Sequence, residues 1–440
     1  MRGLKSTILL VAVLGGLVAY IYFVDSKRPE SGTETTKDKA FAELTAEQIE
    51  EVQLRSESGE TARVQKTGET WNLVEPEAVE ADSIALSTLT TTIAGLEIER
   101  VVDENPTDVK QYGLDPARVD VGFRVKGEKE FRHLLVGQKT PTGGDLYAKK
   151  PDEKRVFLIP SYHDTGLNRT PFDLRDKDVL KFVREDADGL EITHAGETRQ
   201  FARTAPTEWK IVKPVAARGD YAALEGELTR ISSLQMHKIV APQADDLRQY
   251  GLDKPDFTVT VTTGSARATV IIGKKGEDGL YAKDIARPMI FTVEETITQE
   301  FAKALDEFIR KDMFDSRAFT TNRVEFRRGA DTQAFEKSKG ADDKDIWKDA
   351  AGKTVDATAV DNLLAKMSNL RVTAFDATQN PSLKTPALTV TVRFDENKTE
   401  TVAFGRSGAD VFGKRSDEAA SGKLDAMLFD EMMTTLDALK

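Results

Sequence analysis

The residue types that most often carry out catalysis or bind metal ions are scarce in this sequence, or lack the spacing that such sites need. The chain has no cysteine, which excludes disulfides, thiolate metal ligands and cysteine nucleophiles. No G-x-S-x-G serine motif is present. The four histidines show neither H-x-x-x-H nor H-x-H spacing; they are His133, His163, His194 and His237. The sequence therefore identifies no catalytic residue, no cofactor-binding residue and no metal ligand.

Carboxylates are the one abundant class of potential catalytic groups, with 74 aspartates and glutamates in the chain. No spacing singles out a pair of them. The acidic run of Asp342, Asp343 and Asp345 lacks the ligand spacing of a calcium loop and is typical of a solvated loop before Trp347. A hydrolase that acts on envelope glycan or peptide, with paired carboxylates in a cleft between units, remains an alternative.

Basic residues follow a glycine at the end of three expected strands: Gly137-Gln138-Lys139, Gly273-Lys274-Lys275 and Gly405-Arg406. None fits the phosphate-binding pattern G-x-x-x-x-G-K-[ST], and none leads into a helix. We expect solvated hairpin ends, and we keep Lys139, Lys274, Lys275 and Arg406 as weak candidates for binding lipid headgroups or cell-wall polymer. The formal charge of −12 argues against nucleic acid as a partner, because phosphate neutralisation needs a basic surface.

An internal repeat organises the rest of the chain. The three tryptophans, Trp71, Trp209 and Trp347, are each separated by 138 residues (209 − 71 and 347 − 209). Later motifs repeat with a slightly shorter offset, as in Tyr147-Ala148-Lys149 and Tyr281-Ala282-Lys283. We predict three units: residues 44–180, residues 181–316 and a diverged third unit, residues 317–440. Each tryptophan opens a strand and is expected to pack in the core.

The string Tyr112-Gly113-Leu114-Asp115 recurs as Tyr250-Gly251-Leu252-Asp253 and degenerates in the third unit to Ser382-Leu383-Lys384. We interpret it as the end of a helical turn, with the glycine at a positive φ and the leucine packed back on the turn. A binding pair made by the tyrosine and the aspartate is the less favoured interpretation.

Hydrophobic patterning predicts the same elements in each unit. Short alternating strands come first, as in 52–56, 62–67 and 71–76, and a helix then begins near Asp82, Asp220 or Asp356 as N-cap. Further strands follow, and a closing helix is expected over 297–311 in the second unit. Strands grouped before and after a helix predict an α+β fold with mainly antiparallel sheets.

The N-terminus predicts the cellular location. Residues 8–24 form an uncharged apolar run, preceded by Arg2 and Lys5. Extended to residues 4–24, the segment is long enough for one transmembrane helix, and Tyr20, Tyr22 and Phe23 fit an interfacial belt better than a cleavage site. We predict an uncleaved, single-pass signal anchor with a cytoplasmic N-terminus. Residues 25–43 are expected to be a flexible polar tether. The orientation of the anchor places the remaining chain outside the cytoplasm.

The anchor, the W-x-[LI]-V-x-P strand, the Y-G-L-D string and the Y-A-K hairpin together resemble a family of bacterial envelope proteins classed as a domain of unknown function. The resemblance implies a neighbourhood with the auxiliary and permease components of gliding-motility-type ABC transporters, and it carries over no active-site residue. Together with the repetition, it leads us to expect a non-enzymatic accessory or scaffold protein of the inner membrane. A cell-wall polymer or lipid binding module is a further alternative to the hydrolase.

Overall fold

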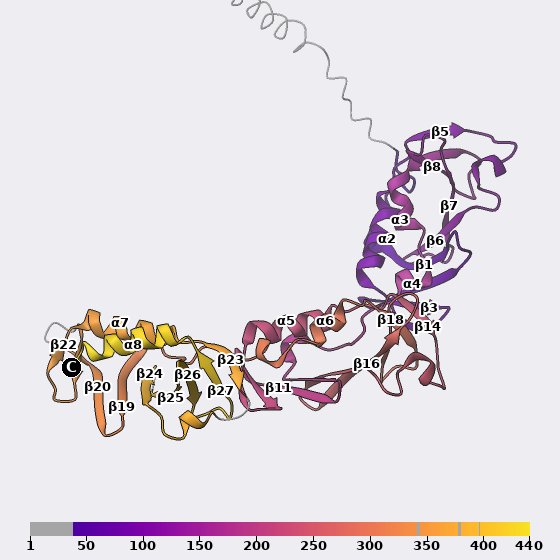
Figure 1. Ribbon diagram of the computed structural model, residues 1–440. Coiled ribbons are helices and arrows are strands. Elements are labelled where there is room, and N and C mark those ends of the chain that lie inside the picture. The colour runs from indigo at the N-terminus through magenta and orange to yellow at the C-terminus, as the bar shows by residue number, and fades with distance from the viewer. Residues whose placement is uncertain (1–37, 341–343, 377–379, 396) are drawn as a thin grey trace, which may run out of the picture. The chain divides into compact units, whose positions relative to one another are not determined.

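The computed structural model describes residues 38–340, 344–376, 380–395 and 397–440 (Figure 1). The expected membrane anchor, residues 4–24, and most of the expected tether, residues 25–43, lie outside these residues. Among the described residues, no helix has both the length and the apolar character needed to cross a membrane. The chain forms two compact units, Met1–Asp176 and Lys177–Lys440.

Three antiparallel sheets of nine strands each form the framework of these units, one sheet for each sequence repeat. The strand order of the first sheet is β4-β3-β2-β1-β6-β7-β8-β9-β5. The second and third sheets, both in the second unit, have the equivalent orders β13-β12-β11-β10-β15-β16-β17-β18-β14 and β22-β21-β20-β19-β24-β25-β26-β27-β23. A meander of four strands is followed by a helix, a short strand at the far edge and a second meander in the middle. The predicted α+β class with mainly antiparallel sheets is confirmed.

The strands of the three sheets have closely similar bounds within each repeat. The first sheet comprises β1 Ile49–Arg55, β2 Thr61–Thr67, β3 Thr70–Glu75, β4 Val79–Glu80, β5 Arg100–Asp103, β6 Val119–Val125, β7 Arg132–Lys139, β8 Asp145–Lys149 and β9 Val156–Pro160. The second comprises β10 Gly189–His194, β11 Glu197–Ala205, β12 Glu208–Lys213, β13 Ala217–Gly219, β14 Lys238–Ala241, β15 Phe257–Thr263, β16 Ala266–Lys275, β17 Leu280–Asp284 and β18 Ile290–Val293. The third comprises β19 Thr321–Arg328, β20 Asp331–Lys339, β21 Asp345–Asp349, β22 Thr354–Val355, β23 Val372–Asp376, β24 Leu388–Phe394, β25 Lys398–Ser407, β26 Asp410–Arg415 and β27 Ser421–Leu424.

One long helix follows the first meander of each repeat: α2 Ser83–Gly95, α5 Tyr221–Ser232 and α7 Ala357–Ser368. Each begins after the predicted aspartate, whose carboxylate accepts hydrogen bonds from backbone N–H groups of the first turn, as in Ala223 N to Asp220 Oδ1 at 2.9 Å. These bonds satisfy donors that a helix start leaves unpaired. The predicted starts at Asp82, Asp220 and Asp356 are confirmed.

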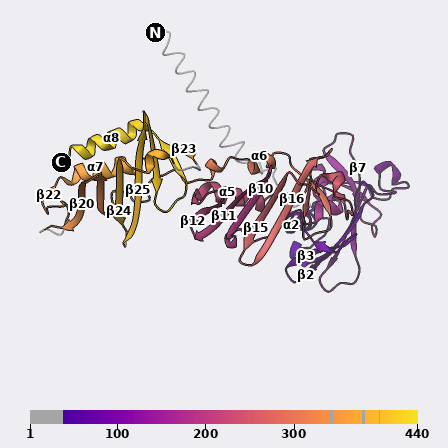
Figure 2. The ribbon, with the colours of Figure 1, turned by 60° about the horizontal axis from the view of Figure 1, so that its bottom comes forward.

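The buried stripe of each long helix packs on one face of its sheet, as Figure 2 shows for α5 and α7. In α2 the stripe is made by Leu86, Leu89 and Ile93, which are at most 1% exposed. Ile84, which the sequence also placed among the apolar helix positions, is 78% exposed because it lies in the first turn, beyond that stripe.

The closing segments differ among the repeats, and the prediction of one helix over 297–311 is wrong. The second repeat closes with α6 Ile297–Phe301 and the 3₁₀ turn η7 Leu305–Glu307. The guanidinium of Arg199 donates to the carbonyl oxygens of Phe301 and Lys303. In a longer helix these oxygens would accept from backbone N–H groups one turn later, so α6 ends here. The first repeat closes with η4 Ser161–His163, α3 Asp164–Leu167 and α4 Pro171–Leu174, whereas the third has the full helix α8 Ala426–Asp437.

The tryptophans occupy equivalent buried positions, one in each repeat. Trp71 in β3 is 8% exposed, and Trp209 in β12 and Trp347 in β21 are both 2% exposed. Trp71 and Trp347 belong to the hydrophobic cores that lie between their sheets and helices. The indole Nε1 of Trp209 donates to Glu225 Oε1 at 2.9 Å. The expected core role of these residues is confirmed.

Candidate functional site

The Tyr-Gly-Leu-Asp string and the glycine of the following strand form one contact. Each string is a 3₁₀ turn, η3 Lys110–Tyr112 or η6 Arg248–Tyr250, that ends in a glycine with φ of 69° at Gly113 and 70° at Gly251. A Cβ at Gly137 or Gly273 would overlap the carbonyl oxygen of the turn's tyrosine. The glycine in the strand is therefore needed because the turn's backbone lies directly on it.

The two tyrosine motifs also meet at this contact. The rings of Tyr112 and Tyr147 have centroids 4.9 Å apart, and those of Tyr250 and Tyr281 are 5.1 Å apart. The leucines of the strings are buried, at 4% exposure for Leu114 and 2% for Leu252, whereas Asp115 and Asp253 are exposed. The aspartates thus lie at the surface, whereas the tyrosine rings pack on the hairpin tyrosines.

The diverged third repeat keeps the backbone contact without the tyrosines. Here the turn is η8 Pro381–Leu383, and a Cβ at Gly405 would lie 2.5 Å from the carbonyl oxygen of Ser382. Phe412 stands at the position of the hairpin tyrosines. What the three repeats share is the close approach of turn and strand rather than a set of functional groups.

The basic residues after each glycine belong to the strands and are largely paired. The expectation that the strands end at the glycine is wrong, since β7 continues to Lys139, β16 to Lys275 and β25 to Ser407. Lys139 lies 3.8 Å from Asp164, Lys275 lies 2.9 Å from Glu295, and Arg406 pairs with Asp430. Each acidic partner comes from the closing segment of the same repeat. Lys274 is exposed.

A second repeated arrangement secures the chain where it enters each repeat. Residues 38–41, 177–180 and 311–314, called the entry clips, each form an antiparallel bridge to the segment after the long helix. The first bond of each clip joins Ala40 N to Leu96 O (2.8 Å), Val179 N to Leu234 O (2.9 Å) and Met313 N to Leu370 O (3.0 Å). The second joins Ile98 N to Asp38 O, Met236 N to Lys177 O and Val372 N to Lys311 O, all at 2.8 Å. The clips were not predicted from the sequence. The signal that indicates them is an apolar pair at the entry to each repeat: Ala40-Phe41, Val179-Leu180 and Met313-Phe314.

A cation from the last hairpin of each sheet holds each clip. Lys150 Nζ donates to Ala40 O at 3.1 Å, Arg287 donates to Val179 O, and Arg415 Nη1 donates to Met313 O at 3.0 Å. Each cation also pairs with a carboxylate three residues away in the hairpin. The cation comes first in the first and third repeats, as Lys150 before Glu153 and Arg415 before Glu418. In the second repeat the order is reversed, with Asp284 before Arg287.

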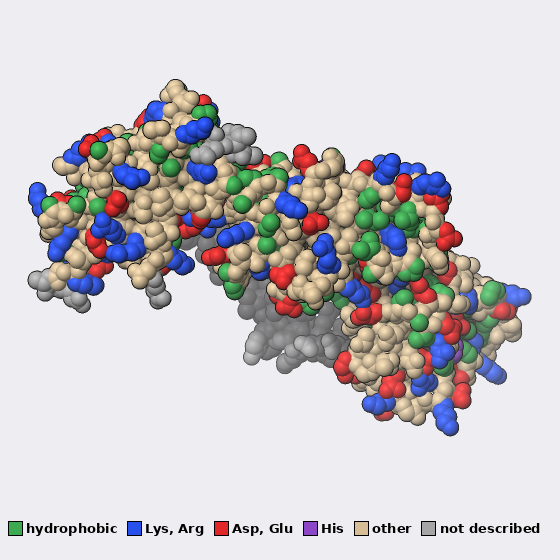
Figure 3. All heavy atoms as spheres, turned by 90° about the horizontal axis from the view of Figure 1, so that it is seen from below, with side chains coloured by type: hydrophobic (Ala, Val, Ile, Leu, Met, Phe, Trp, Pro, Cys, Tyr) green, Lys and Arg blue, Asp and Glu red, His purple; other side chains and the backbone are tan. Residues whose placement is uncertain are grey.

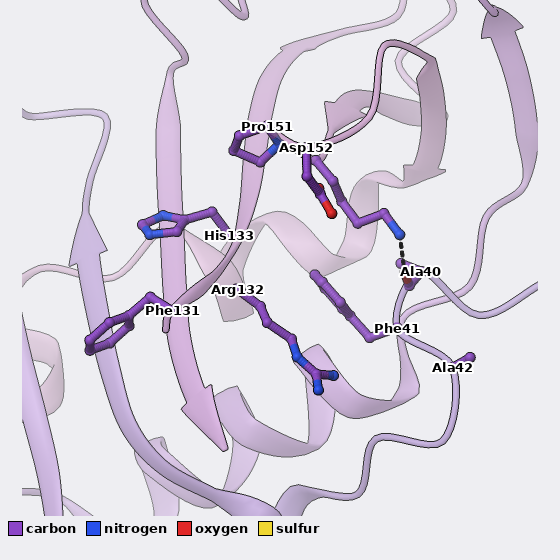
Figure 4. A pocket seen from close by; sticks show the side chains of 9 residues that line it. Ala40, Phe41, Ala42, Phe131, Arg132, His133, Pro151 and Asp152 are labelled. Atoms are coloured by element: carbon purple, nitrogen blue, oxygen red, sulfur yellow. Dashed lines mark hydrogen bonds between the residues drawn. The ribbon is translucent and has the colours of Figure 1, made fainter. Parts of the chain in front are cut away.

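A pocket of 380 Å³ lies beside the clip of the first repeat (Figure 4). Three of its lining side chains have partners: Arg132 pairs with Glu128, His133 Nδ1 lies 2.9 Å from Asp120, and Lys150 holds the clip. The remaining charged lining residue, Asp152, is exposed. In Figure 4 the His133 and Phe131 side chains point away from Phe41 and Arg132. The lysine, the arginine and the histidine of this lining are thus each engaged in a contact that builds the repeat.

A larger groove, of 740 Å³, lies between the second and third repeats within the second unit. Ion pairs and a backbone hydrogen bond join the two repeats here. Arg218 of β13 pairs with Asp315 at 2.7 Å and with Glu418 at 2.6 Å, and Ala419 N donates to Ala216 O at 2.9 Å. Asp312 pairs with Arg371 at 3.1 Å. The groove is thus a polar seam in which Asp312 and Asp315 are engaged in ion pairs.

A buried carboxylate in the second repeat escaped the sequence analysis. Glu227 in α5 is 0% exposed, and neither carboxylate oxygen has a hydrogen-bond partner among the described residues. Burial raises the pKa of Glu227, although Lys303 and Arg230 oppose the shift. Counting from the N-cap, its position is occupied by Leu89 in α2 and Leu363 in α7. Aligning the three helices on their aspartates would have revealed a charge in place of a core leucine.

No cluster of metal ligands accompanies these features. Within the described residues, no group of three or more histidine, cysteine, aspartate or glutamate side chains is placed to hold a metal ion.

A model of one protein family matches most of this chain. The family is described as "Domain of unknown function (DUF4340)", and its model matches residues 71–208 and 209–388. Each match begins at a tryptophan in the third strand of a sheet, so the bounds of the family matches are offset from those of the structural repeats. No curated protein sequence matches the chain.

Solved structures give only remote likenesses. The DNA polymerase sliding clamp from Pseudomonas aeruginosa, with ligand, is 8% identical, with 87% of this chain and 92% of that chain covered and a TM-score of 0.16. A second structure of the same clamp is 8% identical, with 86% and 91% covered and a TM-score of 0.15. Scores this low carry no argument about fold or function.

Proposed function

The chain belongs to the family described as Domain of unknown function (DUF4340), and from this membership we propose that it is a membrane-anchored scaffold protein of the bacterial envelope. In this proposal residues 4–24 cross the inner membrane once, with the N-terminus in the cytoplasm. The tether is shorter than the expected 25–43 and ends at residue 37, because residues 38–41 form the first entry clip and Ala40 and Phe41 are buried. The three repeats form a periplasmic body. That body serves as an auxiliary partner of an ABC-type transport system of the gliding-motility type.

One observation carries the proposal: the motifs that the repeats share are used to build the repeats themselves. The tryptophans are buried, the Tyr-Gly turn lies on the strand glycine, and the hairpin cations hold the entry clips. A catalytic motif would instead leave functional groups converging on a pocket. Repetition of a module for its fold is typical of proteins that present extended surfaces to partners.

The surface is consistent with a protein partner rather than a polyanion. In Figure 3 lysine and arginine side chains are interspersed with aspartate and glutamate over the face shown. Nucleic acid and acidic polymers need a continuous basic surface.

Purification of the tagged full-length chain from cross-linked cells of its own bacterium tests the proposal. We expect the permease and ATPase subunits of one ABC transporter to co-purify in a fixed ratio. The matched control fuses residues 1–43 to an unrelated periplasmic domain, so that anchoring alone cannot enrich the transporter. Equal recovery with the control, or no transporter subunit in either sample, would refute the role as a transporter partner. Fractionation and protease accessibility of the same full-length chain test the anchor and its orientation separately.

A further inference from the structure

Glu227 lies in a cluster of charged groups in the second repeat. Arg199 of β11 is 7% exposed and lies opposite Ile192 of β10. The residues equivalent to Arg199 are Ala62 in the first repeat and Gln333 in the third. The equivalents of Glu227 are leucines, so neither charge has a charged equivalent in the first or third repeat. Two buried charges at positions that are uncharged in both other repeats require a reason beyond packing.

The guanidinium of Arg199 binds the end of α6 and makes no hydrogen bond to Glu227. It donates to the carbonyl oxygens of Phe301 and Lys303 at the end of α6. The Glu227 carboxylate lies in the same cluster without a hydrogen bond, and its nearest cation is Arg230, with Nη1 3.8 Å from Oε2. A neutral carboxyl group tolerates such surroundings, whereas a buried carboxylate requires donors.

We propose that Arg199 is a two-position latch: it holds the end of α6 while Glu227 is protonated, and it turns to the Glu227 carboxylate when that group ionises. The ionisation breaks the carboxyl O–H bond and releases one proton to solvent, and no other bond of the side chain changes. Phe301 O and Lys303 O then lose their donor, and the end of α6 loosens.

The charged groups around Glu227 all belong to this cluster. Glu197 and Arg199 are on β11, Arg230 is on α5, Glu300 is on α6 and Lys303 follows α6. Glu300 is held by Arg230 at 3.0 Å and by Lys303. In the proposed latch these three groups stay paired with one another, and Arg199 is the group whose hydrogen bonds change with the proton of Glu227.

The latch acts on the segment that leads out of the second repeat. Downstream of α6 and η7, Phe308 is 1% exposed and its carbonyl accepts a hydrogen bond from Asp220 N at 2.7 Å. Arg310 N donates to Arg218 O at 2.9 Å, beside the ion pairs of the junction with the third repeat. A looser α6 therefore makes the hold on this junction sensitive to pH. The inference does not depend on the proposed transporter partner.

Hydrogen–deuterium exchange of the full chain at pH 5 and pH 8, corrected for intrinsic exchange rates, tests the latch. We expect the protection of residues 298–308 to fall by about tenfold or more at pH 8, the change that one unit of pKa displacement produces. Glu227→Gln, which keeps the shape and removes the charge, should retain the protection at both values. Glu227→Leu, which copies the other two repeats, should do the same.

Two further measurements keep the outcome decisive. Arg199→Met removes the donor and should leave residues 298–308 weakly protected at both pH values, while α8 in the same molecule serves as an internal control. Glu225→Gln, on the same helix but paired with Arg203 at 2.7 Å, should leave the pH dependence as in the unaltered chain. A pH dependence that persists in Glu227→Gln, or that is missing from the unaltered chain, would overturn the proposal.

Discussion

A methyl group at Gly273 should destabilise the second repeat specifically. A Cβ at this position would overlap Tyr250 O and would lie 2.8 Å from Gly251 O and 2.9 Å from Gly251 C. These atoms are backbone, and the φ of 70° at Gly251 fixes the turn that carries them. The Gly273→Ala chain must therefore lift the turn from the strand and disturb the Tyr250–Tyr281 contact.

The magnitude follows from the kind of atoms that have to move. Overpacking a close contact costs about 1–3 kcal/mol, and the cost is highest where no flexible side chain can give way. The lower entropy of an unfolded chain with alanine returns about 0.4–1 kcal/mol. We therefore expect a net loss of about 1–2 kcal/mol. With a urea m-value of about 2 kcal/mol per molar, the midpoint for this repeat should fall by about 0.5–1 M.

The tryptophans supply the assay, because each repeat has one buried indole. In a background with Trp71→Phe and Trp347→Phe, the fluorescence of Trp209 reports the second repeat alone. The matched control is Gly226→Ala in α5, where a Cβ would meet only Arg230 Nη1, at an ordinary 3.7 Å. This control should raise the midpoint, since alanine exceeds glycine by up to about 1 kcal/mol inside a helix. Equal midpoints for the two variants would refute the reasoning about the turn contact.

Three further substitutions test the electrostatic account. Arg415→Met should lower the stability reported by Trp347 fluorescence in urea by about 3–5 kcal/mol, because it leaves the Glu400 carboxylate, 1% exposed, without its buried cation. Burial alone would raise the pKa of Glu51, but hydrogen bonds from Arg124 and a second arginine more than offset it, so that pKa is lowered. The stability that Glu51 contributes is thus present above its unfolded pKa and is lost as the pH falls through the folded one, so thermal melts should show the gap to Glu51→Gln closing below about pH 4. Asp220→Ala removes the N-cap of α5 and should cost about 1 kcal/mol in the Trp209 signal; no change would contradict the cap.

Local signals were sufficient to predict most of the elements. The alternating strands and the aspartate N-caps depend on neighbours within a few residues, so they can be read from the sequence. The positive φ at Gly113 and Gly251 follows from the same kind of signal, a glycine just after a helical turn. The repeat supplied a second test of each element, since a pattern seen three times is less open to misreading than one seen once.

Contacts between distant segments explain what the sequence did not reveal. The closing helix over 297–311 failed because Arg199, about 100 residues earlier in the chain, binds the carbonyls that end α6. The strand position of Gly273 was misjudged because the turn that covers it lies in a different segment. Glu227 was overlooked because its pattern position fits an amphipathic helix, and only comparison with Leu89 and Leu363 makes its charge unusual.

The reversed charge pair in the second repeat identifies what the three modules must preserve. An ion pair between hairpin residues three apart is satisfied by either order of charges, so the pair alone does not determine which position is basic. The clip carbonyl does impose a choice, because it accepts only from a donor. In the second repeat the reversed order puts the cation, Arg287, three residues further along the hairpin, and it still donates to the clip carbonyl Val179 O. The equivalent bonds in the other two repeats join Lys150 to Ala40 O and Arg415 to Met313 O. The common requirement is therefore the hold on the entering chain rather than the sign of the hairpin surface. A surface that recognised one ligand through these charges three times over would have kept their order.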